Sequence, residues 1–237
     1  MTIRNWFLLM LAPLLVACTS NQQVSEQDIV NSMQRVDNYD GLILHYKEQL
    51  QRNNNDQTAA LKLAQTYLEK GDTESAKFYA DHLLSQGVKN WQLMQLRGEI
   101  YDKEANYAKA VTLYQQSIAM GNQSSDVHVL LGIAHSKLDQ FSQAEAQFNQ
   151  ARLKGHSDMV IKNNLAVIYL AQGEYQRVTD LLMPVYKDNP TNRAVKANLA
   201  IALFKQGLVQ QARELLNQDY SDSQVAAISQ RLYDVGG

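Results

Sequence analysis

Five small residues recur at a constant spacing of 34 positions and fix the architecture of most of this chain: Ala64, Gly98, Gly132, Ala166 and Ala200. No insertion or deletion interrupts the period. A period of this length is typical of a unit made of two helices. Such a unit buries its apolar face only against neighbouring units, so the period predicts a row of stacked helix pairs and not a single globular core.

Three further columns follow the same period. Twelve positions after each small residue comes another short side chain, which would let two helices approach closely: Ala76, Ala110, Ala144, Val178 and Ala212. Three positions after it comes a larger packing residue: Tyr67, Tyr101, His135, Tyr169 and Leu203. Seven positions after it comes a residue suited to a helix end with positive φ, and only the second member departs from this rule: Gly71, Ala105, Asp139, Gly173 and Gly207.

These columns together resemble the tetratricopeptide repeat. The resemblance covers five complete units at 57–90, 91–124, 125–158, 159–192 and 193–226. It implies an all-α fold in which helix pairs form a right-handed superhelix. Repeat arrays of this kind bind proteins and rarely act as enzymes. Only three prolines interrupt the chain and no segment alternates as a strand does, which also favours an all-helical chain.

The N-terminal 17 residues are predicted to be a signal peptide. Arg4 precedes an apolar run from Trp6 to Ala17, which as a helix would span about 18 Å, short of the roughly 30 Å hydrocarbon core of a bilayer. The run ends in Leu15-Val16-Ala17-Cys18, which resembles the lipobox of bacterial lipoproteins. This resemblance implies that Cys18 is lipidated after cleavage, and Thr19 is compatible with transfer to the outer membrane, facing the periplasm.

Ordinary signal cleavage with a free thiol is the alternative for Cys18. It is the only cysteine, so it forms no internal disulfide.

The segments that flank the five units have separate predicted roles. Residues 18–28 are polar and are expected to be a flexible tether. Residues 29–56 are expected to form a degenerate opening repeat, and residues 221–235 a capping helix over the last open face. Pro184 falls inside a predicted helix of the fourth unit, where we expect a kink or a local opening.

We expect the first helices of the units to line a groove for a partner. The last three units place an apolar stripe there, with asparagines that could hydrogen-bond the backbone of a bound segment. The predicted groove residues are Val129, Ile133, Asn163, Asn164, Val167, Leu170, Asn198, Ile201 and Phe204. The first two units place a mixed polar wall at the equivalent positions. The alternative is that the stripe is intramolecular core, covered by the closing helix or by a second copy of the chain.

No arrangement of residues predicts catalysis. The five histidines are scattered without metal-ligand spacing, and no nucleophile elbow or phosphate loop is present, so we expect no enzyme, no metal and no cofactor. With a net charge of −2, the chain offers no excess of basic residues for a polyanion, and we expect no nucleic-acid partner.

The last third of the chain resembles the TadD family, the tetratricopeptide lipoproteins of the Flp or tight-adherence (Tad) pilus system. The resemblance rests on the runs 163–169, 181–184 and 195–200 and on Asp219-Tyr220-Ser221. It implies an outer-membrane accessory, or pilotin, that assists localisation or multimerisation of the pilus secretin. A pilotin of an ordinary type IV pilus and a regulator of envelope assembly or of cell-wall hydrolases are the alternatives.

Overall fold

The computed structural model describes residues 25–217 and 219–234, so the predicted signal peptide and Cys18 lie outside the described residues. The described part contains thirteen α-helices and no strand. The helices are α1 Glu26–Arg35, α2 Tyr39–Arg52, α3 Gln57–Lys70, α4 Thr73–Ser85, α5 Trp91–Lys103, α6 Tyr107–Ala119, α7 Ser125–Lys137, α8 Phe141–Leu153, α9 Asp158–Ala171, α10 Tyr175–Asp188, α11 Arg193–Lys205, α12 Val209–Leu216 and α13 Asp222–Asp234. None of these helices is long and apolar enough to cross a bilayer.

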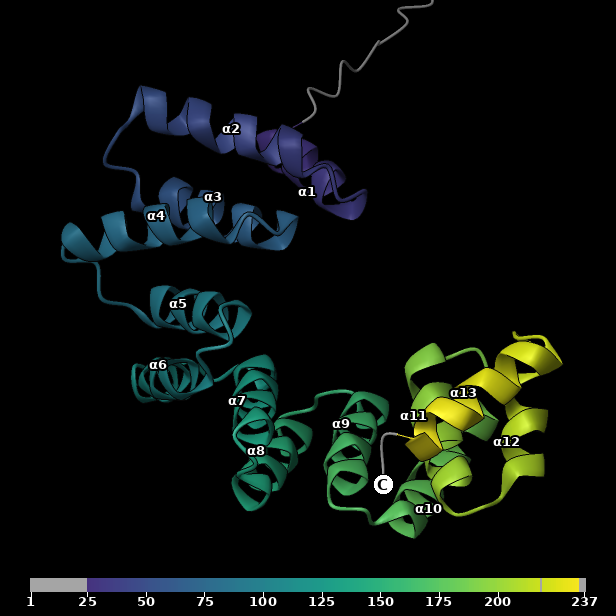
Figure 1. Cartoon of the computed structure of the whole chain (residues 1–237). Helices are drawn as coiled ribbons and strands as arrows, with labels where there is room; N and C mark the ends of the chain where they lie inside the picture. Colours follow the sequence, from purple (N-terminus) through teal and green to yellow (C-terminus); the bar gives the residue numbers. More distant parts are fainter. Residues whose placement is uncertain (1–24, 218, 235–237) are drawn as a thin grey trace, which may run out of the picture.

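The helices follow one another as hairpins along a curved path, with α1–α4 at one end and α11–α13 at the other (Figure 1). Each helix contacts the next, and the first helices of successive hairpins also contact each other, α3 with α5, α5 with α7, α7 with α9 and α9 with α11. The first helices therefore form a continuous layer. This is the predicted superhelix of helix pairs.

The residue seven positions after each small residue explains why the first helix of each hairpin ends where it does. Gly71, Gly173 and Gly207 have positive φ, as the spacing predicts. Ala105 and Asp139 take the same left-handed conformation, at φ 57° and 55°. Polar side chains then cap the next helix, as Asp72 does for α4 and Asn106 for α6.

The small residues that recur every 34 positions keep the two helices of a hairpin close together. A Cβ on Gly98 would lie 2.5 Å from Cε1 of Tyr114, and a Cβ on Gly132 would lie 2.6 Å from Cε1 of Phe148. Both aromatic rings are buried between the helices of their hairpin. The period in the sequence therefore reports a packing requirement, since a larger residue would push the two helices apart.

The predicted tether is too long at its C-terminal end. Residues 26–28 form the first turn of α1 and are not part of a coil. Ser25 accepts a hydrogen bond from the backbone of Asp28, and the Asp28 carboxylate accepts one from the backbone of Ser25. This reciprocal cap starts the helix at a polar sequence that has little apolar content of its own.

Pro184 does not open its helix. α10 is continuous from Tyr175 to Asp188. Leu182 and Val185 are buried on either side of the proline and hold both parts of the helix against the core. The predicted local opening is therefore wrong, and the alternative, a kink, stays a prediction.

Candidate partner-binding groove

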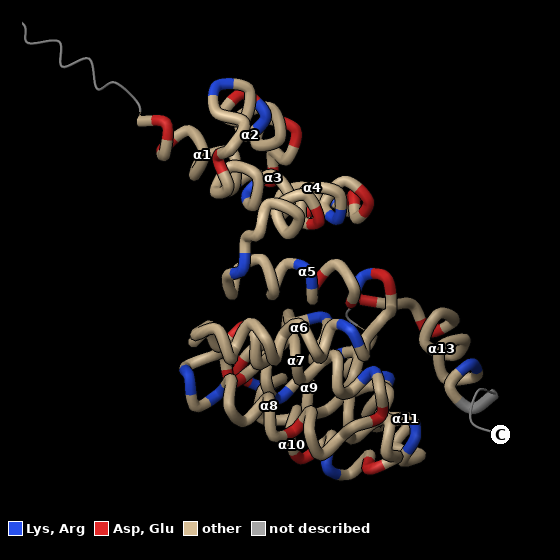
Figure 2. Tube along the Cα trace, turned by 90° about the vertical axis from the view of Figure 1, so that its left-hand side faces the viewer, with Lys and Arg blue, Asp and Glu red and all other residues tan. Residues whose placement is uncertain are grey.

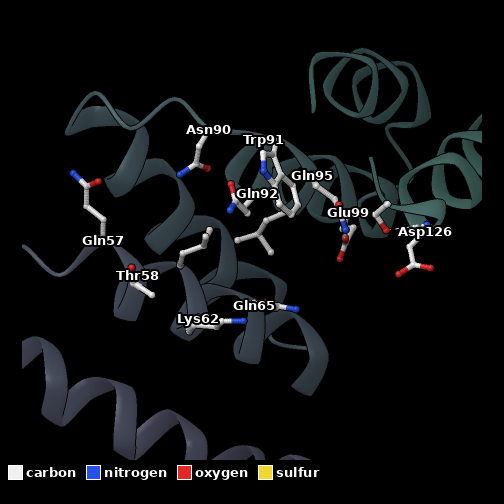
Figure 3. Close-up of a pocket in the computed structure, with 13 residues that line it drawn as sticks. Gln57, Thr58, Lys62, Gln65, Asn90, Trp91, Gln92, Gln95, Glu99 and Asp126 are labelled. Carbon is white, nitrogen blue, oxygen red and sulfur yellow. Dashed lines mark hydrogen bonds between the residues drawn. The ribbon is translucent and has the colours of Figure 1, made fainter. Parts of the chain in front are cut away.

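An open groove of 550 Å³ lies between α3 and α5 and extends to the start of α7. Its walls are largely polar, with Lys62 and Gln65 on α3 and Gln92 and Glu99 on α5 (Figure 3). The indole of Trp91 lies among them. These helices are the first helices of their hairpins, so the groove is on the face where the sequence predicts partner binding, but in the first repeats and not the last.

A chain of hydrogen bonds holds the Glu99 carboxylate in place. Gln95 donates from Nε2 to Oε1 of Glu99 at 2.8 Å, and its own Oε1 accepts from Nδ2 of Asn122 at 2.8 Å. Asn122 also donates to Oγ of Ser117 at 2.9 Å, and Ser117 donates to the carbonyl of Trp91 at 2.8 Å. Asn122 and Ser117 are buried, so the groove carboxylate is oriented by a polar network that begins inside the protein.

Glu99 in the groove and Asp102, one turn further along α5, both have raised pKa values. Burial raises the pKa of Glu99, and the negative charges of Glu69 and Asp102 raise it further, while the Gln95 hydrogen bond and Lys103 oppose the shift. Burial also raises the pKa of Asp102, against the lowering effect of Lys103 and Lys137. Both carboxylates are therefore poorly compensated when ionised.

The charges of these two carboxylates also act on Tyr114, which is buried between α5 and α6. Burial raises the pKa of Tyr114, with added contributions from Asp102 and Glu99. Its side chain is fully buried, yet its hydroxyl has no hydrogen-bond partner. Oδ1 of Asp102 is also buried without a partner. Buried polar atoms without partners are uncommon in proteins, and two of them occur here on α5 and α6.

Charges of both signs are spread along the chain. Lys and Arg are interspersed with Asp and Glu over the described helices (Figure 2). In the described part of the chain, no group of three or more His, Cys, Asp or Glu side chains could hold a metal ion.

Comparison with known proteins agrees with this geometry. Family models described as tetratricopeptide repeat match residues 58–85, 103–163 and 169–231, more than half of the chain. The chain belongs to the tetratricopeptide repeat family. No curated protein matches it.

Solved tetratricopeptide repeat structures share the fold at low sequence identity. TTC0263 of Thermus thermophilus is 19% identical, with a TM-score of 0.60 over 76% of this chain and 99% of that chain. A repeat protein of Parabacteroides merdae is 13% identical, with a TM-score of 0.66 over 81% and 76%. PilF of Pseudomonas aeruginosa is 17% identical, with a TM-score of 0.60 over 76% and 83%. At these identities the comparison shows the fold alone.

Two residues of the predicted apolar stripe are core residues. Phe204 is fully buried and Val129 is 8% exposed, so the prediction that they line an open groove is wrong. α13 packs against α11 and α12 as the first helix of a further repeat would, and its Ile228 and Leu232 join the core cluster that holds Phe204. Val129 belongs to the same cluster, which includes residues of α8 and α9.

The other stripe residues form no open apolar surface. Ile133 and Leu170 pack against the core, and Ile201 is half-buried. Only Val167 is well exposed, at 45%. Most residues of the stripe therefore belong to the intramolecular core, which is the alternative that the sequence left open.

The predicted asparagines lie on neighbouring first helices. Nδ2 of Asn198 donates to Oδ1 of Asn163 at 2.9 Å, so this pair bonds across α9 and α11. Asn164 is half-buried beside them. The structure brings these residues together at the C-terminal repeats, away from the open groove of the first repeats.

Sequence reasoning found the polar wall of the first two repeats but assigned the partner site to the apolar stripe. The missed signal is the set of polar residues at the groove positions, above all Gln65, Gln95 and Glu99. They occupy the same repeat positions as the stripe residues Val129, Ile133 and Val167. Polar residues stay accessible at these positions, whereas the apolar ones attract covering elements.

Proposed function

We propose that this protein is a lipid-anchored scaffold on the periplasmic face of the outer membrane that assists assembly of a Flp (Tad) pilus. In this proposal it binds the pilus secretin, or another assembly component, and promotes localisation or multimerisation of the secretin. The open groove on the first helices is the observation that carries the binding role. The lipobox-like sequence ending at Cys18 and the resemblance to the TadD family support the location and the pilus role.

The anchor would keep the repeats near the membrane. Ser25 already caps α1, and the chain from Cys18 to Ser25 can span at most about 25 Å. A lipid on Cys18 would therefore hold the first repeats, and the groove, close to the bilayer. A partner that assembles in that membrane would meet the groove without a long search through the periplasm.

Replacement of the lipidated residue tests this proposal. In a strain that lacks the native gene, Cys18→Ser is expected to abolish outer-membrane fractionation of the chain, lower the amount of secretin multimer and remove surface pili. Circular dichroism of the variant is expected to match that of the wild type, because residue 18 lies outside the repeats. Unchanged secretin multimers and piliation would refute the pilotin role.

Thr19→Asp is a matched control for location. This change keeps the cysteine, but by resemblance to sorted lipoproteins it favours retention in the inner membrane. We expect the chain to remain lipidated, to fractionate with the inner membrane and to leave the secretin unassembled. Normal piliation by this variant would show that pilus assembly does not depend on the outer-membrane location of the chain.

A further inference from the structure

The groove of the first repeats contains carboxylates without a neutralising cation. Among the ion pairs of the described residues, none involves Glu69, Glu99 or Asp102. Glu99 and Asp126 line the groove, and the charges of Glu69 and Asp102 act on Glu99 from outside the lining. Asp126 approaches only His156, at 3.5 Å. This end of the groove is therefore acidic and under-compensated.

We infer that this groove binds a protein segment that presents a lysine or arginine side chain to Glu99 and Asp102. The inference rests on the proposed scaffold function, because it takes the ligand to be a protein. It names the chemistry of the segment, which the family fold leaves open. A cation between the two carboxylates would supply the charge that the protein itself lacks there.

Two buried polar atoms on α5 and α6 lack hydrogen-bond partners, Oδ1 of Asp102 and the hydroxyl of Tyr114. The ring of Tyr114 passes Gly98, where a Cβ would lie 2.5 Å from Cε1, so only glycine lets the tyrosine cross between α5 and α6 at this level. The charges of Asp102 and Glu99 act on this hydroxyl, which has no hydrogen-bond partner. Asp102 could accept a hydrogen bond from Tyr114 on Oδ1 and still receive a cation on Oδ2.

The orientation of Glu99 also favours a cationic ligand over a neutral one. Gln95 occupies one carboxylate oxygen, and the network through Asn122 and Ser117 fixes the position of Gln95. The second oxygen of Glu99 is left for a donor in the groove. A preorganised carboxylate loses little entropy when it receives a charged donor, so this arrangement suits a lysine or arginine.

The cations already near the groove do not occupy this position. Lys103 follows Asp102 on α5 and is exposed, and Lys137 on α7 is also exposed. Both lower the pKa of Asp102, yet neither reaches it as an ion pair. Lys62 lines the opposite wall on α3 and does not contribute to the shift of Glu99. A basic residue of a partner would therefore be the first cation in direct contact with Glu99 and Asp102.

Selection of peptides tests this inference directly. The probe is a library of short random peptides displayed on phage, panned against the full lipidated chain in detergent. Peptides recovered on the wild type are expected to be enriched in lysine and arginine. The selected peptides are expected to bind about tenfold more weakly to the double variant Glu99→Gln, Asp102→Asn than to the wild type. Their binding to the wild type is expected to weaken as the salt concentration rises from about 50 to about 500 mM.

The matched control removes two exposed carboxylates elsewhere, as Asp188→Asn with Glu214→Gln, and is expected to bind as the wild type does. Thermal melts establish that every variant is folded. Selection of peptides without basic residues, equal binding by the Glu99 and Asp102 variant, or failure to select any peptide would overturn the inference. None of these results would change the Cys18→Ser experiment, so the scaffold proposal stands or falls separately.

Discussion

At the scale of single residues, Ala105 holds a backbone conformation that its side chain disfavours. Its φ is 57°, where the equivalent residues of three other repeats are glycines. A Cβ in the left-handed region costs about 1–2 kcal/mol, partly offset by the lower entropy of alanine in the unfolded chain. We therefore expect Ala105→Gly to raise the free energy of unfolding by about 0.5–1 kcal/mol, measured by urea denaturation.

Gly71→Ala is the matched control for Ala105→Gly. A Cβ at Gly71 would meet no atom within 4 Å, so its cost comes from φ alone, which is 90°. The control is expected to lose about 1 kcal/mol. If Ala105→Gly were instead less stable than the wild type, the left-handed turn would not be strained.

Glu99 predicts a pH dependence of stability. Its pKa in the folded protein is raised by burial and by Glu69 and Asp102, so the folded state binds a proton more tightly than the unfolded state. The stabilisation from that proton is complete below the unfolded-state value, about 4.3, and is lost as pH rises through the folded-state value. Glu99→Gln is therefore expected to melt at a higher temperature than the wild type at pH 7, with the difference shrinking towards pH 4.

The exposed Glu214 is the control for this pH series. Glu214→Gln is expected to melt close to the wild type at both pH values, because its carboxylate lies in solvent. A Glu99→Gln protein that melts lower than the wild type at pH 7 would contradict the account of Glu99 as a half-buried carboxylate that no cation compensates.

At the scale of elements, α13 converts part of the predicted binding surface into core. Phe204 is fully buried in the core cluster against which Ile228 and Leu232 of α13 pack. Lys205 of α11 donates to the carbonyl of Leu232 in α13. Lys196, also on α11, pairs with Asp219 just before α13. Apolar contact and these two polar contacts together hold the closing helix on the last repeat.

Truncation of Phe204 measures this packing. Phe204→Ala is expected to lower the free energy of unfolding by about 3–5 kcal/mol, because it leaves a cavity between α11 and its neighbours. Val167→Ala, at an exposed position of the same stripe, is expected to cost less than about 1 kcal/mol. Urea denaturation of both variants checks the contrast. A small loss for Phe204→Ala would mean that α13 does not cover it.

The elements differ in how far the sequence predicts them. The sequence predicts the helix pairs because two requirements restrict the residue type at fixed positions of the period. Close helix packing requires a small residue, as at Gly98, and the turn requires a residue that tolerates positive φ, as at Gly71. The burial of Phe204 in the core could not be predicted from the sequence. An apolar residue at a groove position gives the same sequence pattern whether a partner or another helix of the chain covers it. The start of α1 was missed because its cap, Ser25 with Asp28, lies in a segment without apolar periodicity.

At the scale of the whole molecule, the two ends of the superhelix differ in what remains open. The first repeats leave a polar groove of 550 Å³ between α3 and α5. The last repeats are closed by α13, and their asparagines bond to each other. A partner is therefore expected to engage the N-terminal repeats, which are also the repeats nearest to the proposed lipid anchor.

Site-specific photo-crosslinking in intact cells tests this central claim most directly. A photoreactive residue is placed at Gln92 in the groove and, in separate strains, at Phe78 on α4, which is exposed but outside the groove. The account predicts a discrete protein adduct from position 92 and none from position 78. An adduct from position 78 alone, or equal adducts from both, would contradict the claim that the groove of the first repeats receives the partner.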